Sequence, residues 1–171
     1  MSDDIRIYVA DLAAYNNGKL HGVWVDATAE IDDIWSAVHA MLARSPESLA
    51  EEWGIHDYEG FGPIRLSEWE CFERVREIAL FIEEYPLIGA VLIDHYGGEV
   101  DEARRAADES YSGVYTSLAA YAEELTNETT QIPDNLTYYI DDEQMGRDME
   151  LNGDIYTLKT AYAEVHVLWS H

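Results

Sequence analysis

The sequence predicts an α+β fold: an elongated row of small modules with short antiparallel sheets. Three observations lead to this prediction. The 171-residue chain has 35 acidic and 10 basic residues, a formal net charge of −25, spread along its whole length. Self-repulsion at this charge opposes compaction into a single sphere. The chain is also 47% hydrophobic and 12% aromatic, which excludes an acidic disordered protein. Finally, segments with strand-like and helix-like periodicity alternate along it.

Residues 1–63 are predicted to form an α/β domain. Ile5, Ile7 and Val9 alternate with polar or small residues, as in a half-buried strand. An Asn-Asn-Gly-Lys turn signal then leads to a second strand over residues 20–25. Apolar residues at helical spacing predict a helix that begins near residue 31, and Ile-His-Asp-Tyr further along is a candidate third strand.

Residues 64–98 are predicted to form a helical domain. Ser67 and Glu70 make a Ser-x-x-Glu capping box, which we expect to begin a helix with Trp69 facing inward. Pro86 is expected to start the next helix, and the following Gly-Gly pair to end it. A helical unit this small needs neighbours to complete a core.

Residues 99–171 are predicted to form a second α/β domain. A helix is expected over about 114–127, and another is expected to follow and to end near Asp148. Asn152-Gly153 is typical of a turn, and the segments after it, including residues 162–168, are predicted to be two antiparallel strands.

Enzyme signatures are missing from the sequence, which has no Gly-x-Ser-x-Gly, phosphate-binding glycine loop, His-Glu-x-x-His or cysteine pair. The stretch that begins at Asp148 resembles a calcium loop, but Lys159 stands where a bidentate carboxylate is needed. His56 and His95 each lie beside a carboxylate without a second histidine at ligand spacing, which favours structural roles. Cys71 is interpreted as an inert core thiol. No catalytic residue, cofactor or metal is therefore expected.

The charge also restricts location and partners. The N-terminus is acidic instead of carrying the cationic region of a secretory signal, and the longest apolar run has seven residues, against the ~20 that span a bilayer. We therefore expect an intracellular, cytoplasmic protein. Nucleic acid and anionic membranes would both be repelled, so the expected partner is a basic protein.

Acidic residues recur in pairs on or beside the predicted helices, and few have a basic residue at pairing distance. Glu73 and Glu77 are spaced i, i+4, where like charges destabilise a helix by a few tenths of a kcal/mol. B-form DNA carries one charge per ~1.7 Å of axis, so this excess charge matches roughly 40 Å of duplex. Mimicry of nucleic acid and a merely solvated or salt-adapted acidic surface both explain such a pattern.

Four stretches together resemble the ArdA family of antirestriction proteins. Residues 7–24 contain a Tyr-Asn turn and a Gly-x-Trp strand, and residues 51–59 contain Ile-His-Asp-Tyr-Glu. Residues 118–133 are similar to the family's antirestriction motif region, and residues 139–153 contain Tyr-Ile-Asp followed by Gly-Arg-Asp. These stretches follow the family's order from one end of the chain to the other.

The resemblance implies three small domains in a curved rod and dimerisation through the C-terminal domain. It implies an inhibitor, encoded on mobile genetic elements to evade host defence, that imitates bent B-form DNA. Such an inhibitor occupies the DNA groove of a type I restriction–modification enzyme, on its specificity and modification subunits. Neither catalysis nor a cofactor is implied. The acidic residues expected to bind this enzyme are Glu51, Glu52, Glu73, Glu77, Glu83, Glu84, Asp101, Glu102, Asp108, Glu109, Glu123, Glu124, Glu128, Asp141, Asp142 and Asp148.

A homodimer needs an apolar patch, because charge repulsion opposes self-association. We expect this patch at Tyr138, Tyr139, Val165, Val167 and Trp169, unless these residues fill the domain's own core. Two other functions remain open. One is a small acidic enzyme whose site is assembled from scattered carboxylates and histidines. The other is an acidic adaptor or inhibitor of some other basic DNA-binding protein.

Overall fold

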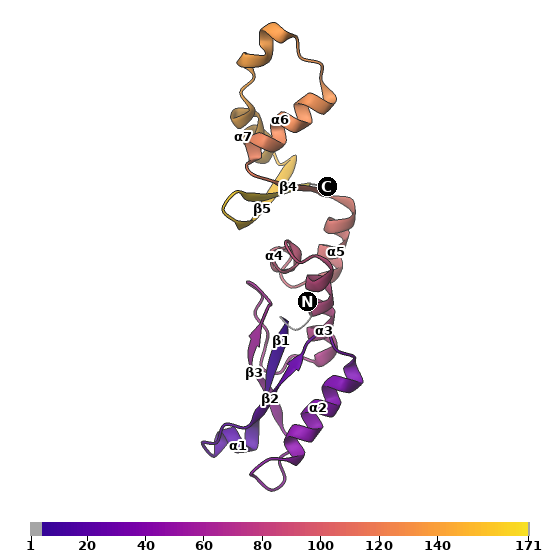
Figure 1. The fold of residues 1–171 in the computed structure, drawn as a ribbon, viewed down its shortest axis with the longest axis vertical. Coiled ribbons are helices and arrows are strands. Elements are labelled where there is room, and N and C mark those ends of the chain that lie inside the picture. The colour runs from indigo at the N-terminus through magenta and orange to yellow at the C-terminus, as the bar shows by residue number, and fades with distance from the viewer. Residues whose placement is uncertain (1–4, 171) are drawn as a thin grey trace. The chain divides into compact units, whose positions relative to one another are not determined.

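The computed structural model describes residues 5–170 and confirms the α+β class. Within these residues, strands form two three-stranded antiparallel sheets, and helices flank each sheet (Figure 1). The chain divides into two compact units, Met1–Val100 and Asp101–His171. Each unit contains one of the sheets, so each builds its core around strands of its own.

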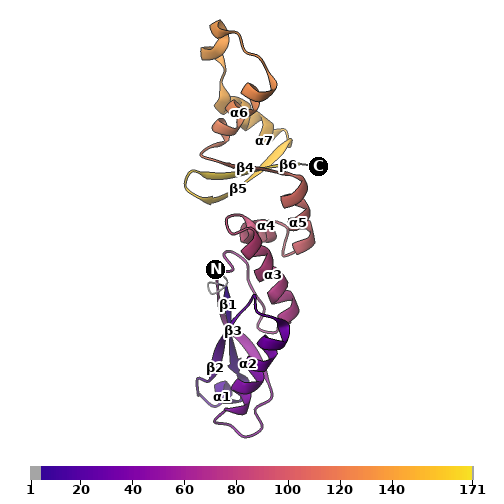
Figure 2. The same cartoon turned by 45° about the vertical axis from the view of Figure 1, so that its right-hand side comes forward.

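The N-terminal sheet has β1 (Arg6–Asp11) at its centre, between β2 (Gly22–Asp26) and β3 (Trp53–Glu59). Ile7 and Val9 of β1 are fully buried, as their alternation predicts. The helix α2 (Ile31–Ala43) contacts β1 and β2, and it crosses the sheet in Figure 2. The predicted strands and helix of this region are therefore confirmed.

The short helix α1 (Leu12–Asn16) follows β1 directly and begins at Asp11, whose side chain accepts a hydrogen bond from the Ala14 amide (3.2 Å). The helices α3 (Phe72–Glu84) and α4 (Gly89–His95) complete the unit. Phe72 stacks on Trp53, with ring centroids 4.3 Å apart, and meets Trp35 at 4.7 Å. This aromatic cluster joins α2, β3 and α3, so the helical segment shares its core with the sheet.

The capping box does not begin α3 as predicted. Ser67 and Glu70 form a turn, in which the Ser67 amide donates to the Glu70 carboxylate (3.4 Å), and α3 starts only after Cys71. The prediction that Trp69 faces inward is wrong, because this turn leaves its side chain 65% exposed. Cys71 is likewise exposed and is not a core thiol.

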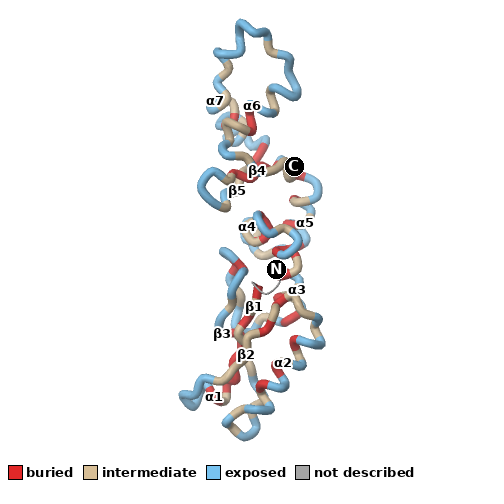
Figure 3. Tube along the Cα trace, viewed as in Figure 1, coloured by how far each residue is buried: buried red, intermediate tan, exposed pale blue. Residues whose placement is uncertain are grey.

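The C-terminal unit has a sheet in the order β4 (Tyr111–Tyr115), β6 (Glu164–Trp169), β5 (Ile155–Ala161). The helix α5 (Val100–Glu109) precedes the sheet. The helices α6 (Leu118–Thr129) and α7 (Asp142–Leu151) contact each other, and a 3₁₀ turn, η2 (Asp134–Tyr139), lies between them. The segment from η2 to the start of α7 is largely exposed (Figure 3). The unit's core is built from Tyr121, Ile155, Val165 and Val167.

Two local predictions for this unit need correction. Residues 111–115 form the strand β4, because they pair with β6, so the helix expected from about residue 114 starts only at Leu118. Tyr162 lies in the turn between β5 and β6, so the last strand begins only at Glu164. The turn interpretation of Asn152-Gly153 is confirmed: Gly153 has φ +81° and ends α7, and the next amide donates to the Met149 carbonyl (3.0 Å).

Candidate protein-binding surface

The acidic residues predicted to bind a partner lie almost entirely at the surface. Fifteen of the sixteen are exposed, and Asp142 is half-buried. Six of them belong to the N-terminal unit and ten to the C-terminal unit. Neither unit therefore holds the charge alone.

On α3, Glu73, Glu77 and Glu84 form a row along one side of the helix. Helical geometry places them within about 40° of one another, and they span about 17 Å along the axis. The buried residues of α3, such as Val75 and Ile82, point to the opposite side and hold the row outward. One strand of B-form DNA places about five phosphates along the same length. A single helix therefore supplies only part of such a charge density.

The helices of the C-terminal unit carry similar groups. On α6, Glu124 and Glu128 lie one turn apart, on the side where Tyr115 approaches. Burial, and next the neighbouring Glu124 carboxylate, raise the pKa of Tyr115 above its ordinary value. The Glu124 and Glu128 carboxylates thus lie close enough to Tyr115 to add to the effect of burial on its pKa. On α7, Asp141 accepts a hydrogen bond from the Gln144 amide (2.9 Å) and so also caps the helix.

Several basic residues pair with acids outside the predicted set. Arg6, Lys19, Arg74, Arg76 and Arg147 lie 2.8–3.6 Å from Glu59, Glu47, Glu70, Glu30 and Glu143. Within the set, Glu102 pairs with Arg105 at 3.4 Å. These pairs are solvent-accessible and contribute little to stability. Their consequence is that five of the ten Lys and Arg residues are paired with acids outside the sixteen.

One histidine–carboxylate pair of the kind that could serve an enzyme lies in the N-terminal unit. His56 Nε2 lies 3.2 Å from Glu68 Oε1, at an exposed position on the N-terminal sheet. Among residues 5–170, no three histidine, cysteine or acidic side chains are grouped so that they could hold a metal ion. In the same residues, no helix combines the length and apolar character needed to cross a membrane.

The residues predicted for a dimer contact separate into two groups. Tyr138 is 94% and Tyr139 80% exposed, and Trp169 is 38% exposed. Val165 and Val167 are buried in the core of their own unit. Their assignment to a dimer surface is corrected, because a side chain enclosed by its own unit cannot contact a second copy.

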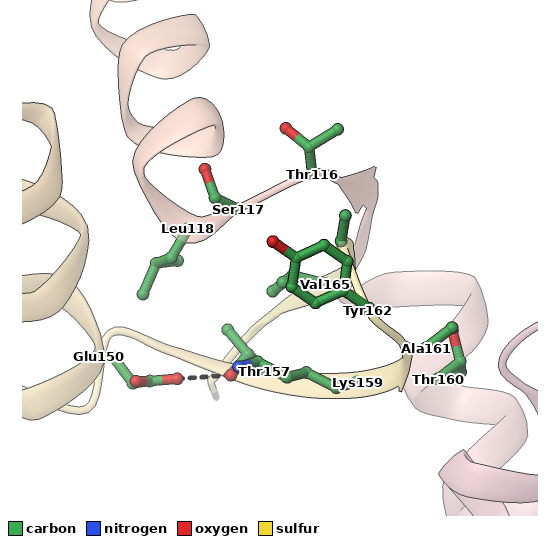
Figure 4. Close-up of a pocket in the computed structure, with 11 residues that line it drawn as sticks. Thr116, Ser117, Leu118, Glu150, Thr157, Lys159, Thr160, Ala161, Tyr162 and Val165 are labelled. Atoms are coloured by element: carbon green, nitrogen blue, oxygen red, sulfur yellow. Dashed lines mark hydrogen bonds between the residues drawn. The ribbon is translucent and has the colours of Figure 1, made fainter.

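Sequence reasoning missed a pocket of about 630 Å³ in the C-terminal unit (Figure 4). It lies between the start of α6 and the hairpin of β5 and β6, where Thr157 donates a hydrogen bond to Glu150. Tyr162 lines it and is fully exposed. Ala163, beside it, has φ +60°, a strained value for a residue other than glycine. Tyr162 and Ala163 form the two-residue turn between β5 and β6, and no glycine or asparagine marks this turn in the sequence.

The fold and the surface thus define a small acidic α+β protein with many exposed carboxylates. The family model for antirestriction protein (ArdA) matches residues 7–164, most of the chain. The chain therefore belongs to the ArdA family, and its function is antirestriction, with a restriction enzyme as the general class of partner. A search among curated proteins gave no match.

Proposed function

We propose that this protein inhibits type I restriction–modification enzymes by imitating B-form DNA. Its carboxylates take the place of DNA phosphates in the groove formed by the specificity and modification subunits, whose Lys and Arg side chains normally contact phosphate. The observation that carries the proposal is the exposure of fifteen of the sixteen predicted acidic residues. Blocking this groove in the cytoplasm protects an incoming mobile element from cleavage.

The distribution of charge supports this mechanism. Residues 1–100 contain 20 acidic and 6 basic residues, and residues 101–171 contain 15 and 4. The total excess matches the phosphate charge of roughly 40 Å of duplex. Mimicry needs carboxylates in rows, and α3 supplies one such row in the N-terminal unit, while Glu124 and Glu128 begin another on α6.

Binding of this kind depends on many weak contributions. An exposed ion pair contributes less than ~1 kcal/mol, and salt screens it further. Affinity therefore results from the sum of the carboxylates, and specificity from their placement. The same reasoning assigns no catalytic step to any of them.

Assembly as a homodimer doubles the available charge array. We expect the contact to use Tyr138, Tyr139 and Trp169, which are exposed apolar side chains of the C-terminal unit. Sedimentation at micromolar concentration tests this: wild type sediments as a dimer and Tyr138→Asp as a monomer. Tyr162→Asp, a change at another exposed tyrosine, is the control and stays dimeric. Monomeric wild type contradicts the proposed contact.

The division into three domains, at residues 1–63, 64–98 and 99–171, remains part of the proposal. Family resemblance favours it, together with a rod-like arrangement that sets the carboxylates along a DNA-like path. Small-angle X-ray scattering of the full chain tests the arrangement directly. A compact globular scattering profile contradicts it.

The decisive experiment measures binding to the methyltransferase core of a type I enzyme in competition with duplex DNA. We expect mutually exclusive binding and an affinity that falls as salt rises. A ternary complex with DNA, or affinity that is independent of salt, contradicts mimicry. Binding to another basic DNA-binding protein, without binding to the type I core, contradicts the proposed partner. It leaves the proposed mechanism, mimicry of DNA by carboxylates, in place.

A further inference from the structure

The N-terminal sheet has a face that α2 does not cover. Ile7 and Val9 are fully buried, and Tyr8, between them on β1, points to the opposite face. Trp24 of β2 and Asp57 of β3 are the cross-strand partners of Tyr8, so the three side chains share this face. A hollow of about 720 Å³ lies on it. Its walls include Tyr8, Tyr15, Trp24, His56, Asp57 and Glu68.

Two glycines shape this hollow. Gly22 and Gly54 lie on either side of Ala10 in the sheet register. A Cβ atom at Gly22 would lie 2.6 Å from Cζ of Tyr8, and one at Gly54 would lie 2.9 Å from Oε1 of Glu68. Both distances are shorter than real contacts. The phenol ring of Tyr8 and the side chain of Glu68 therefore lie over the glycine positions. A larger residue at Gly22 would also meet the Val9 carbonyl oxygen at 2.5 Å, and one at Gly54 would require Glu68 to move.

The walls combine aromatic rings with carboxylates. The rings of Tyr8 and Trp24 have centroids 5.3 Å apart, and the ring of Tyr15 meets His56 edge-on at 4.7 Å. Tyr15 remains 57% exposed. Glu68 lies 3.2 Å from the His56 ring, so a carboxylate borders the aromatic surface on this side, and Asp57 adds another on β3.

The same face already holds one guanidinium group of the chain itself. Arg6 lies over the Trp24 ring, 4.4 Å from its centroid, and donates a hydrogen bond to Glu59 at 2.8 Å. A cation is thus held between a ring and a carboxylate at one end of the face. Tyr8, Tyr15, Asp57 and Glu68 repeat that combination in the hollow.

We propose that this hollow binds the guanidinium group of an arginine side chain presented by a partner protein. Aromatic faces attract a cation, and the two carboxylates supply the opposite charge and the hydrogen-bond acceptors. A planar guanidinium can stack flat on a ring while it donates two parallel hydrogen bonds to a carboxylate, whereas an ammonium group has neither a planar face nor such a pair of donors. The volume also admits the residues that flank such an arginine.

The net charge of −25 favours a partner that is basic. The site nevertheless goes beyond mimicry of DNA, because phosphate mimicry requires carboxylates alone and this hollow adds rings. An arginine that enters it becomes a buried anchor, in contrast to the exposed ion pairs of the acidic rows.

The test is a titration of the full chain with N-acetylarginine amide, followed by the NMR signal of the Trp24 indole N–H. Trp24→Phe assigns that signal. We expect a saturable shift with a dissociation constant in the millimolar range. The neutral citrulline analogue and the lysine analogue bind at least about fivefold more weakly. No saturable shift, or equal binding of the citrulline analogue, overturns the proposal, and tighter binding of the lysine analogue overturns the choice of arginine.

Matched variants locate the site. Tyr15→Ala and Asp57→Asn change exposed side chains and are expected to weaken binding by about fivefold or more. Asp32→Asn, an exposed acid on α2, and Tyr162→Ala, an exposed tyrosine of the other unit, are the controls and leave binding unchanged. Equal losses in all four variants would show that binding is not confined to the hollow, which overturns the proposal. Because the ligand is a single amino-acid derivative, failure of this test leaves the DNA competition experiment intact, and the reverse also holds.

Discussion

The two units of this protein build similar sheets from different parts of the chain. In the N-terminal unit the central strand is β1, close to the start of the sequence, and its hairpin partner β2 follows within twenty residues. In the C-terminal unit the central strand is β6, at the other end of the chain, and β4 precedes it by about fifty residues. Each sheet therefore joins one nearby strand pair, β1–β2 or β5–β6, to one pair about fifty residues apart, β1–β3 or β4–β6, but the nearby partner follows the central strand in the first sheet and precedes it in the second.

The units also differ in how they treat a buried polar group. Asp11 is fully buried; one carboxylate oxygen caps α1, and the other has no hydrogen-bond partner among the described residues. His166 is also fully buried, but both ring nitrogens have partners, Tyr111 at 2.7 Å and Thr160 at 2.9 Å. The buried Asp11 therefore serves to cap a helix, whereas the buried His166 is hydrogen-bonded to residues of the two neighbouring strands.

The largest expected effect is a loss of stability in the N-terminal unit that leaves the C-terminal unit unchanged. Phe72→Ala removes a fully buried ring that packs against Trp53 and Trp35, and we expect it to cost about 3–5 kcal/mol. Amide hydrogen exchange should rise throughout residues 5–100 and stay unchanged in the C-terminal unit. Trp69→Ala is the control and changes little, because that ring is mostly exposed. Equal destabilisation of both units contradicts their independence.

A second prediction compares the acidic surfaces of the two units in binding to a type I enzyme. Replacing Glu73, Glu77 and Glu84 together by Gln is expected to weaken binding roughly 10- to 100-fold. Replacing Glu123, Glu124 and Glu128 together should have a similar effect. Titration calorimetry or competition with DNA measures both.

Matched Glu→Asp replacements at the same positions keep the charge and serve as controls. A single change, Glu73→Gln, Glu123→Gln or Asp141→Asn, is expected to cost no more than about fivefold. If one such change abolishes inhibition while the fold survives, an enzyme-like site explains the protein better. If only one unit responds to its triple change, that unit alone contacts the enzyme.

The third prediction concerns Asp11. Asp11→Ala removes the acceptor that caps α1 and should destabilise the N-terminal unit by about 0.5–2 kcal/mol. Asp11→Ser keeps an acceptor and removes the oxygen that lacks a partner, so its cost should be smaller. Urea denaturation of the two variants gives the comparison. A larger loss for Ser than for Ala would show that the cap is unimportant.

The smallest expected effect is a pH dependence of stability that is confined to the C-terminal unit. Burial lowers the pKa of His166 below the value it has in the unfolded chain. The unfolded state then binds more protons, so the stability of the C-terminal unit is complete above the unfolded pKa and declines as the pH falls through and below it. Thermal unfolding between pH 7.5 and 5.5 measures this decline. His166→Gln should flatten it in that unit, whereas His39→Gln, at an exposed position, should leave it unchanged.

Much of the N-terminal unit could be predicted because its signals are local. The alternation of Ile5, Ile7 and Val9 indicated a strand with one buried face, and the apolar spacing of α2 indicated a helix. The capping box was a weaker guide, because a Ser-x-x-Glu pair can close a turn as well as begin a helix. Exposure of the acidic residues was also predictable, since unpaired carboxylates are almost never fully buried.

What the sequence by itself determined is the charge, the α+β class and the family, because composition, periodicity and motif order are properties of the chain read in sequence. The tertiary structure alone decided that residues 111–115 form a strand, because their partner β6 lies about fifty residues away. It also decided that Val165 and Val167 face a core while Tyr162 faces solvent. A strand pattern specifies two faces, but only the elements that pack against the strand determine which face is buried, and the hollow on the N-terminal sheet exists for the same reason.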